Sequence, residues 1–126
     1  MAKASSATAD TVKDFGVAVD RSSELDGYTV NFVTITQSHD LAPMLAGLPG
    51  GKCTCPHWGY VIKGKITMRY AAGEEVYETG DAFYCPPGHT PIRHEPGTEL
   101  VQFSPADELL KTEAVLAANL KAMQSR

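Results

Sequence analysis

Residues with the chemistry of metal ligands gather in one short stretch, GGKCTCPHWGYVIKG, which covers residues 50–64. Cys53, Cys55 and His57 alternate there at positions i, i+2 and i+4, so in an extended chain all three side chains leave the same face. Thiolate and imidazole ligands suit zinc, iron or copper better than magnesium or calcium. The alternative is that two small thiols and a ring fill the interior, because free cysteine is often buried as a small hydrophobe.

Composition indicates one ordinary globular domain. The chain has 126 residues, of which 43% are hydrophobic and 21% are charged. Its formal net charge is −4 and its 11 Lys and Arg residues are scattered, which excludes the basic surface of a nucleic-acid-binding protein. Residues 1–15 lack the apolar core of a signal peptide, and no later run has the length of a membrane span.

From these observations we expect a cytoplasmic protein that has neither nucleic acid nor a membrane as a partner. The chain has 3 cysteines, and a reducing compartment disfavours disulfides. Metal binding or plain burial is therefore the better explanation for the thiols.

Short strands with glycine between them predict an all-β domain. We expect a flexible N-terminus over residues 1–12, a barrel over 13–104 and a helix over 105–126. The segment APMLAGLPGG is read as a loop with one helical turn, because it contains two prolines and three glycines. The expected strands are GYTVNFVTIT, WGYVIKG, KITMRYA, EEVYET, DAFYCPP and TELVQFS.

The C-terminal segment is predicted to be a single amphipathic helix. Ser104 with Pro105 behind it marks a helix start, and Asp107 and Glu108 suit the positive end of the helix dipole. Apolar residues recur at helical spacing, namely Leu109, Leu116, Leu120 and Met123. We expect this apolar stripe to pack on the barrel or on a second subunit.

The run GDAFYCPPGH, which begins at Gly80, resembles the second motif of the cupin superfamily of small β-barrels. That motif runs Gly, five residues, Pro-x-Gly, two residues, His. The glycines and the proline match, but Pro91 stands at the final histidine position, and His89 lies two residues earlier. The resemblance implies a double-stranded β-helix, or jelly-roll, with a C-terminal helix.

The first cupin motif, which runs Gly, five residues, His-x-His, three or four residues, Glu, six residues, Gly, is altered here. With Gly64 as its last glycine, His57 stands at the glutamate position, Cys53 at the second histidine position and Gly51 at the first. Cupins normally hold one divalent metal with three histidines and a carboxylate. In this chain the implied ligand set is therefore a substituted one, Cys53, Cys55, His57 and His89.

The resemblance implies a divalent metal ion, with zinc as the first choice and iron or copper as alternatives. One hypothesis is a metal-dependent enzyme that acts on a small organic molecule, by oxygen chemistry with iron or copper, or by isomerisation or hydrolysis with zinc. A second is a metal-free, ligand-binding or redox-sensing module, and a third is a structural barrel whose value is its dimer surface. A homodimer is expected from the resemblance to small cupins.

Other candidate residues are assigned to packing or to the surface. We expect Cys85 to be buried rather than to bind metal. We expect His94, in the charged run IRHEPG, to be exposed, and His39 to lie on the surface, with the rim of the pocket mouth as the alternative for His39. Trp58 and Tyr60 alternate with the inward face, which suggests a second packing layer or contact with a partner subunit.

Overall fold

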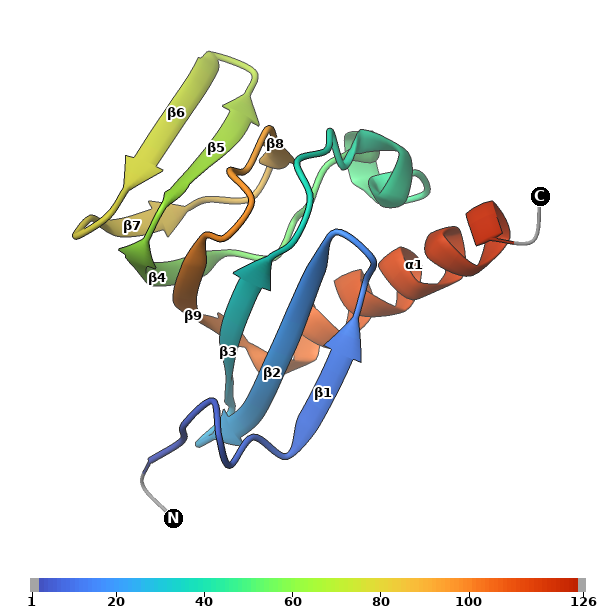
Figure 1. Cartoon of the computed structure of the whole chain (residues 1–126). Coiled ribbons are helices and arrows are strands. Elements are labelled where there is room, and N and C mark those ends of the chain that lie inside the picture. Colours follow the sequence, from blue (N-terminus) through green and yellow to red (C-terminus); the bar gives the residue numbers. More distant parts are fainter. Residues whose placement is uncertain (1–2, 125–126) are drawn as a thin grey trace.

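The computed structural model describes residues 3–124, which form two antiparallel sheets and a C-terminal helix (Figure 1). The prediction of an all-β domain that ends in a helix is confirmed. The larger sheet has the strand order β1-β2-β3-β9-β4-β7, and the smaller sheet has the order β6-β5-β8. The strands are β1 (Thr11–Asp14), β2 (Ala18–Leu25), β3 (Tyr28–Ile35), β4 (His57–Lys63), β5 (Lys65–Tyr70), β6 (Gly73–Glu78), β7 (Ala82–Cys85), β8 (Thr90–Ile92) and β9 (Glu99–Pro105).

An apolar core fills the space between the two sheets. The stacked rings of Tyr77 from β6 and Phe83 from β7 lie 5.0 Å apart between centroids and join the sheets at this level. The buried core residues are Val61, Ile66, Met68, Tyr77, Phe83, Cys85 and Leu100. Gly64 makes the corner between β4 and β5, where the chain passes from the larger sheet to the smaller one. Its φ of +97° and its close approach to the Thr98 side chain leave no room for a Cβ.

The sequence analysis missed two strands at the N-terminal side and one in the second motif. β1 begins at Thr11, inside the segment expected to be flexible, and β2 lies before the first strand that we expected. β8 was missed because Pro91 interrupts its short sequence. Residues 1 and 2 of the expected flexible N-terminus lie outside the described residues.

The C-terminal helix, α1 (Ala106–Gln124), follows β9 directly. Pro105 closes β9 rather than opening the helix, so the helix begins one residue later than expected. Residues 125 and 126 of the expected helix lie outside the described residues. In the part of the chain that the structure describes, no helix has the length and apolar character needed to span a membrane.

The apolar stripe of α1 packs on the chain itself. Leu109 is buried with Leu45, Cys53 and Cys55. The Asn119 side chain donates hydrogen bonds to two backbone carbonyls near the 3-10 helix η1 (Ala42–Leu45), at 2.7 and 2.9 Å. A second 3-10 helix, η2 (Pro49–Gly51), follows, so the segment read as a loop with a helical turn contains two such turns.

Candidate metal centre

Two of the four predicted ligands are brought together by the backbone. Cys53, before β4, and His89, before β8, form an isolated antiparallel bridge. The Cys53 N–H donates to the His89 carbonyl at 3.0 Å, and the Gly88 N–H donates to the Cys53 carbonyl at 2.8 Å. A residue from each cupin-like motif is therefore fixed side by side.

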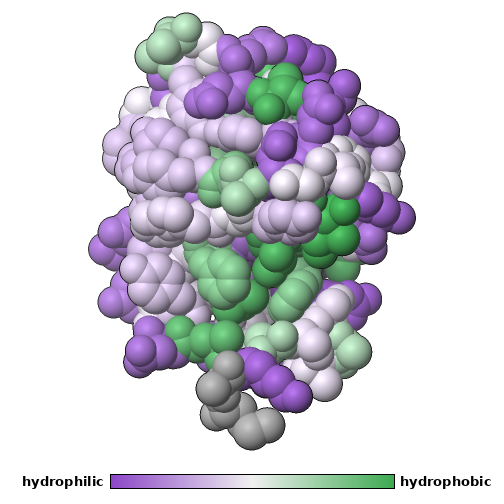
Figure 2. All heavy atoms as spheres, turned by 90° about the vertical axis from the view of Figure 1, so that its left-hand side faces the viewer, coloured by the Kyte–Doolittle hydropathy of each residue, from purple (hydrophilic) through white to green (hydrophobic). Residues whose placement is uncertain are grey.

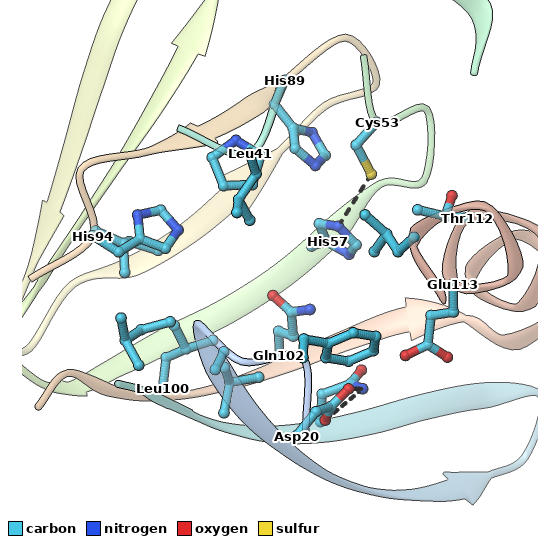
Figure 3. A pocket seen from close by; sticks show the side chains of 18 of the residues that line it. Asp20, Leu41, Cys53, His57, His89, His94, Leu100, Gln102, Thr112 and Glu113 are labelled. Atoms are coloured by element: carbon cyan, nitrogen blue, oxygen red, sulfur yellow. Dashed lines mark hydrogen bonds between the residues drawn. The ribbon is translucent and has the colours of Figure 1, made fainter. Parts of the chain in front are cut away.

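His57 completes the group from the first position of β4, whose register pairs it with Cys85 on β7. Its Nε2 lies 3.7 Å from the Cys53 Sγ, and its ring centroid lies 4.9 Å from that of His89. One ligand atom from each of Cys53, His57 and His89 falls within 4.8 Å of the other two (Figure 3). Ligand distances of roughly 2.0 and 2.3 Å in a tetrahedral zinc site would separate sulfur from nitrogen by about 3.6 Å, close to the observed value.

Hydrogen bonds on the far side of each ring fix how the imidazoles face the centre. His89 Nδ1 lies 2.8 Å from the Pro86 carbonyl oxygen, which can only accept, so this nitrogen carries the proton. Its Nε2 therefore bears the lone pair, and it is buried without a hydrogen-bond partner among the described residues. His57 Nδ1 lies 2.6 Å from the Ser104 Oγ, which leaves its Nε2 directed at Cys53.

Neutral imidazoles suit metal ligation, whereas the thiol must lose its proton when it binds a metal ion. Burial, with a smaller contribution from His89, lowers the pKa of His57 to about 3. Burial also lowers the pKa of His89 and raises the pKa of the Cys53 thiol. Near neutral pH the centre holds two neutral imidazoles and a thiol, and an unpaired lone pair in such a buried place is costly unless something binds it. The donor set fits a zinc, copper or iron ion.

Cys55 lies outside this group. The chain bends between Cys53 and His57, so residues 53–57 do not form the regular strand that would have put all three side chains on one face. The Cys55 thiol contacts the Pro56 carbonyl at 3.6 Å, and burial is the main cause that raises its pKa to about 12. Cys55 packs with Leu45 and Leu109 instead.

The other predicted residues divide between confirmation and correction. Cys85 is buried in the core between the sheets, as expected. His39 is exposed and contacts Gln37, also as expected. The prediction that His94 is exposed was wrong. His94 is buried, its Nδ1 accepts a hydrogen bond from the Thr67 N–H at 3.1 Å, and burial lowers its pKa to about 4.

The candidate metal centre opens onto a cavity of about 160 Å³ that is lined by residues of both sheets and of α1. Most of its wall is apolar, but its other end carries polar side chains that the sequence analysis missed. Figure 3 shows Asp20, Gln102 and Glu113 on the opposite side of His57 from Cys53 and His89. Asp20 escaped notice because it takes an inward position of β2, where an apolar residue would have marked the strand. Gln102 and Glu113 lie on the expected strand β9 and the expected helix α1 and were not singled out.

No protein-family model matches the sequence, and no curated protein matches it either. Solved structures do match. A protein of unknown function from Rhizobium leguminosarum bv. viciae has a TM-score of 0.59 and 18% identity over 82% of this chain and 95% of its own.

Two further solved structures have assigned names. Ectoine synthase from P. lautus has a TM-score of 0.59 and 14% identity over 83% of this chain and 77% of its own. KdgF from Halomonas sp. has a TM-score of 0.52 and 17% identity over 75% of this chain and 86% of its own. At these identities the matches show a shared fold, and a fold does not specify a reaction.

Proposed function

We propose, on the premise that this chain has the cupin fold, that it binds one divalent metal ion through Cys53, His57 and His89 and acts on a small organic molecule. The observation that carries this proposal is the buried convergence of one sulfur and two nitrogen ligand atoms. Three protein ligands leave a coordination position free to face the cavity. Zinc sites of that kind are catalytic, whereas sites closed by four protein ligands are structural.

Zinc is the ion that we propose. When bound, it would supply Lewis-acid chemistry at the open position, by polarising a carbonyl or activating a water molecule. Copper is the second candidate, because two imidazoles and a thiolate are also the ligands of copper electron-transfer sites. Iron is the third, and elemental analysis separates all of them.

The chain's own residues orient the ligands and limit the access of water. Ser104 and the Pro86 carbonyl hold the two rings through their Nδ1 atoms, which is the role that outer hydrogen-bond partners play in metal sites. Leu45 and Leu109 pack around Cys53 and exclude solvent from the sulfur.

The alternative of a redox sensor has less support. Reactive thiols have lowered pKa values and partial exposure. Here burial is the main cause that raises the pKa of each thiol, to about 12 for Cys55 and to about 11 for Cys85. All 3 cysteines are free and buried.

Metal analysis tests the proposal directly. Protein purified without added metal is expected to carry close to one equivalent of zinc per chain. Cys53→Ala and His89→Ala should each lower this occupancy by at least tenfold, because two remaining ligands bind zinc poorly. Cobalt(II) added to the metal-free protein should give a thiolate-to-cobalt absorption band that Cys53→Ala abolishes.

Cys55→Ala is the matched control, since it removes a neighbouring buried thiol that lies outside the group. It should keep both the zinc and the cobalt band. Added imidazole should change the cobalt spectrum if a coordination position is open. Full occupancy in both Cys53→Ala and His89→Ala would contradict the proposed site.

A further inference from the structure

The polar end of the cavity contains a buried hydrogen-bond acceptor that no described residue satisfies. Asn31 on β3 is 1% exposed, and its Nδ2 donates to both carboxylate oxygens of Asp20 on β2, at 3.0 and 2.9 Å. Because Nδ2 must face the Asp20 carboxylate, the orientation of the amide is fixed, and Oδ1 is the amide atom that still lacks a partner. The Asn31 Oδ1 is buried and has no hydrogen-bond partner among the described residues, although Asn31 lines the cavity.

The same end carries more negative than positive charge. Glu113 on α1 and Asp20 both line the cavity, and Glu113 acts on Asp20 as a like charge. Lys13 on β1 pairs with Glu113 at 3.3 Å and stands opposite Asp20 in the β1–β2 register. Two carboxylates and one ammonium leave one negative charge without compensation when both acids are ionised.

The chemistry of a suitable ligand follows from these groups. Ionised carboxylates and an amide oxygen only accept hydrogen bonds, so the ligand must donate them, and the net charge favours a cation. The rest of the wall is mostly apolar, with Phe15, Leu41 and Leu109 among its residues, which suits a hydrocarbon body. The volume of about 160 Å³ is close to the roughly 150 Å³ of an engineered apolar cavity that admits benzene.

We propose that Asp20, Asn31 and Glu113 bind the ammonium group of a small primary amine, whose hydrocarbon part extends along the apolar wall toward Cys53, His57 and His89. The role of that amine as a substrate rests on the proposed function. The binding of the amine does not rest on the proposed function, because none of the three acceptors belongs to the candidate metal centre.

Matched probes test the selectivity by isothermal titration calorimetry. n-Pentylammonium, 1-pentanol and pentanoate share a carbon chain and differ in charge. At about pH 8, well above the Asp20 pKa of about 6, n-pentylammonium should bind roughly 10- to 100-fold more tightly than 1-pentanol, and pentanoate should not bind. Asp20→Asn should weaken n-pentylammonium binding roughly 10- to 100-fold and leave 1-pentanol unchanged.

Glu24→Gln is the control, because it removes a carboxylate from an exposed position on the same strand. It should leave all three affinities unchanged. If circular dichroism shows that Asp20→Asn is unfolded, Glu113→Gln provides the same comparison.

The titrations are repeated on metal-free and zinc-loaded protein, which separates this proposal from the previous one. Amine selectivity that survives in a protein unable to bind zinc supports the amine site and rejects only the metal. Equal affinity for n-pentylammonium and 1-pentanol, or an unchanged affinity in the folded acid-to-amide variant, would overturn the amine site whatever the metal content.

Discussion

The Asp20 carboxyl is buried beside a second acid, and its ionisation is therefore unfavourable in the folded chain. Burial is the main cause that raises its pKa from 3.8 to about 6, and the like charge of Glu113 adds to it. The hydrogen bonds from Asn31 and the charge of Lys13 act in the opposite direction. Between the two pKa values the folded chain binds more protons than the unfolded chain, so the free energy of unfolding falls as pH rises.

Asp20→Asn removes this dependence. Between about pH 4 and pH 7, the free energy of unfolding of the wild type should fall relative to that of the variant by about 2 to 3 kcal/mol, the value of a shift of roughly two pH units. Urea denaturation at both pH values measures the difference. Glu24→Gln should keep the wild-type slope. A parallel pH profile for wild type and Asp20→Asn would show that Asp20 titrates normally.

Residue type and spacing identified most of the candidate metal centre, but not its limits. The cupin-like motifs pointed to Cys53, His57 and His89, which the fold brings together. Cys55 was included because a regular strand was assumed, and the bend before His57 breaks that alternation. His94 was predicted to be exposed because its sequence neighbours are charged, whereas the fold buries it and brings its Nδ1 to the N–H of Thr67, which is distant in the sequence.

Strand prediction from the sequence worked where apolar and aromatic residues dominate a segment and failed where they do not. β4 and β9 place Val61 and Leu100 inward and were expected. β2 was missed because Asp20, its buried position, breaks the hydrophobic alternation on which the prediction relies. Asp20, which interrupts the hydrophobic pattern of β2, is also one of the polar residues that line the cavity.

Glycine is needed at position 64, the corner between β4 and β5, for two reasons: its positive φ angle and the lack of space for a side chain. Gly64 and Gly80 both have positive φ angles, of +97° and +91°. A Cβ at Gly64 would collide with Thr98, whereas a Cβ at Gly80 would meet nothing within 4 Å. Comparison of the two positions therefore separates backbone strain from steric collision.

Gly80→Ala should lower the free energy of unfolding by about 1 to 2 kcal/mol, because a left-handed conformation is unfavourable for alanine. Gly64→Ala has the same strain together with the collision, and should be about 1 to 3 kcal/mol less stable again. Urea denaturation measures both variants at one pH. Equal destabilisation at the two positions would show that Thr98 moves aside without cost.

The molecule as a whole exposes an uncharged aromatic face on the outer side of the larger sheet. The aromatic face consists of Tyr28, Trp58, Tyr60, Ile62, Tyr84 and Phe103, whose exposed fractions lie between 42% and 48%. Trp58 stands opposite Phe103 and Tyr84 in the strand register and stacks on Tyr84 at 5.0 Å. Figure 2 shows a side of the molecule on which hydrophobic side chains (green) and side chains of intermediate hydropathy (pale) are gathered.

The size and composition of the aromatic face favour a second copy of this chain as its partner. With roughly 100 Å² exposed on each side chain, it presents on the order of 600 Å². That is the upper end of the patches found on monomers and most of the roughly 800 Å² that each partner buries in a stable complex. Val101 and Ala82, which pair with Tyr60 on either side, are also uncharged. Two copies related by a twofold axis would therefore meet without repulsion between like charges.

A dimer formed through the aromatic face should dissociate when a charge is placed at its centre. We expect the wild type to sediment as a dimer at micromolar concentration and Trp58→Glu to sediment as a monomer, because burial of an unpaired carboxylate is strongly unfavourable. Leu110→Glu is the control, since Leu110 is a 61% exposed apolar residue on α1 and not on the larger sheet, and it should remain dimeric. A monomeric wild type would reject the dimer, and a dimeric Trp58→Glu would move the interface to another surface.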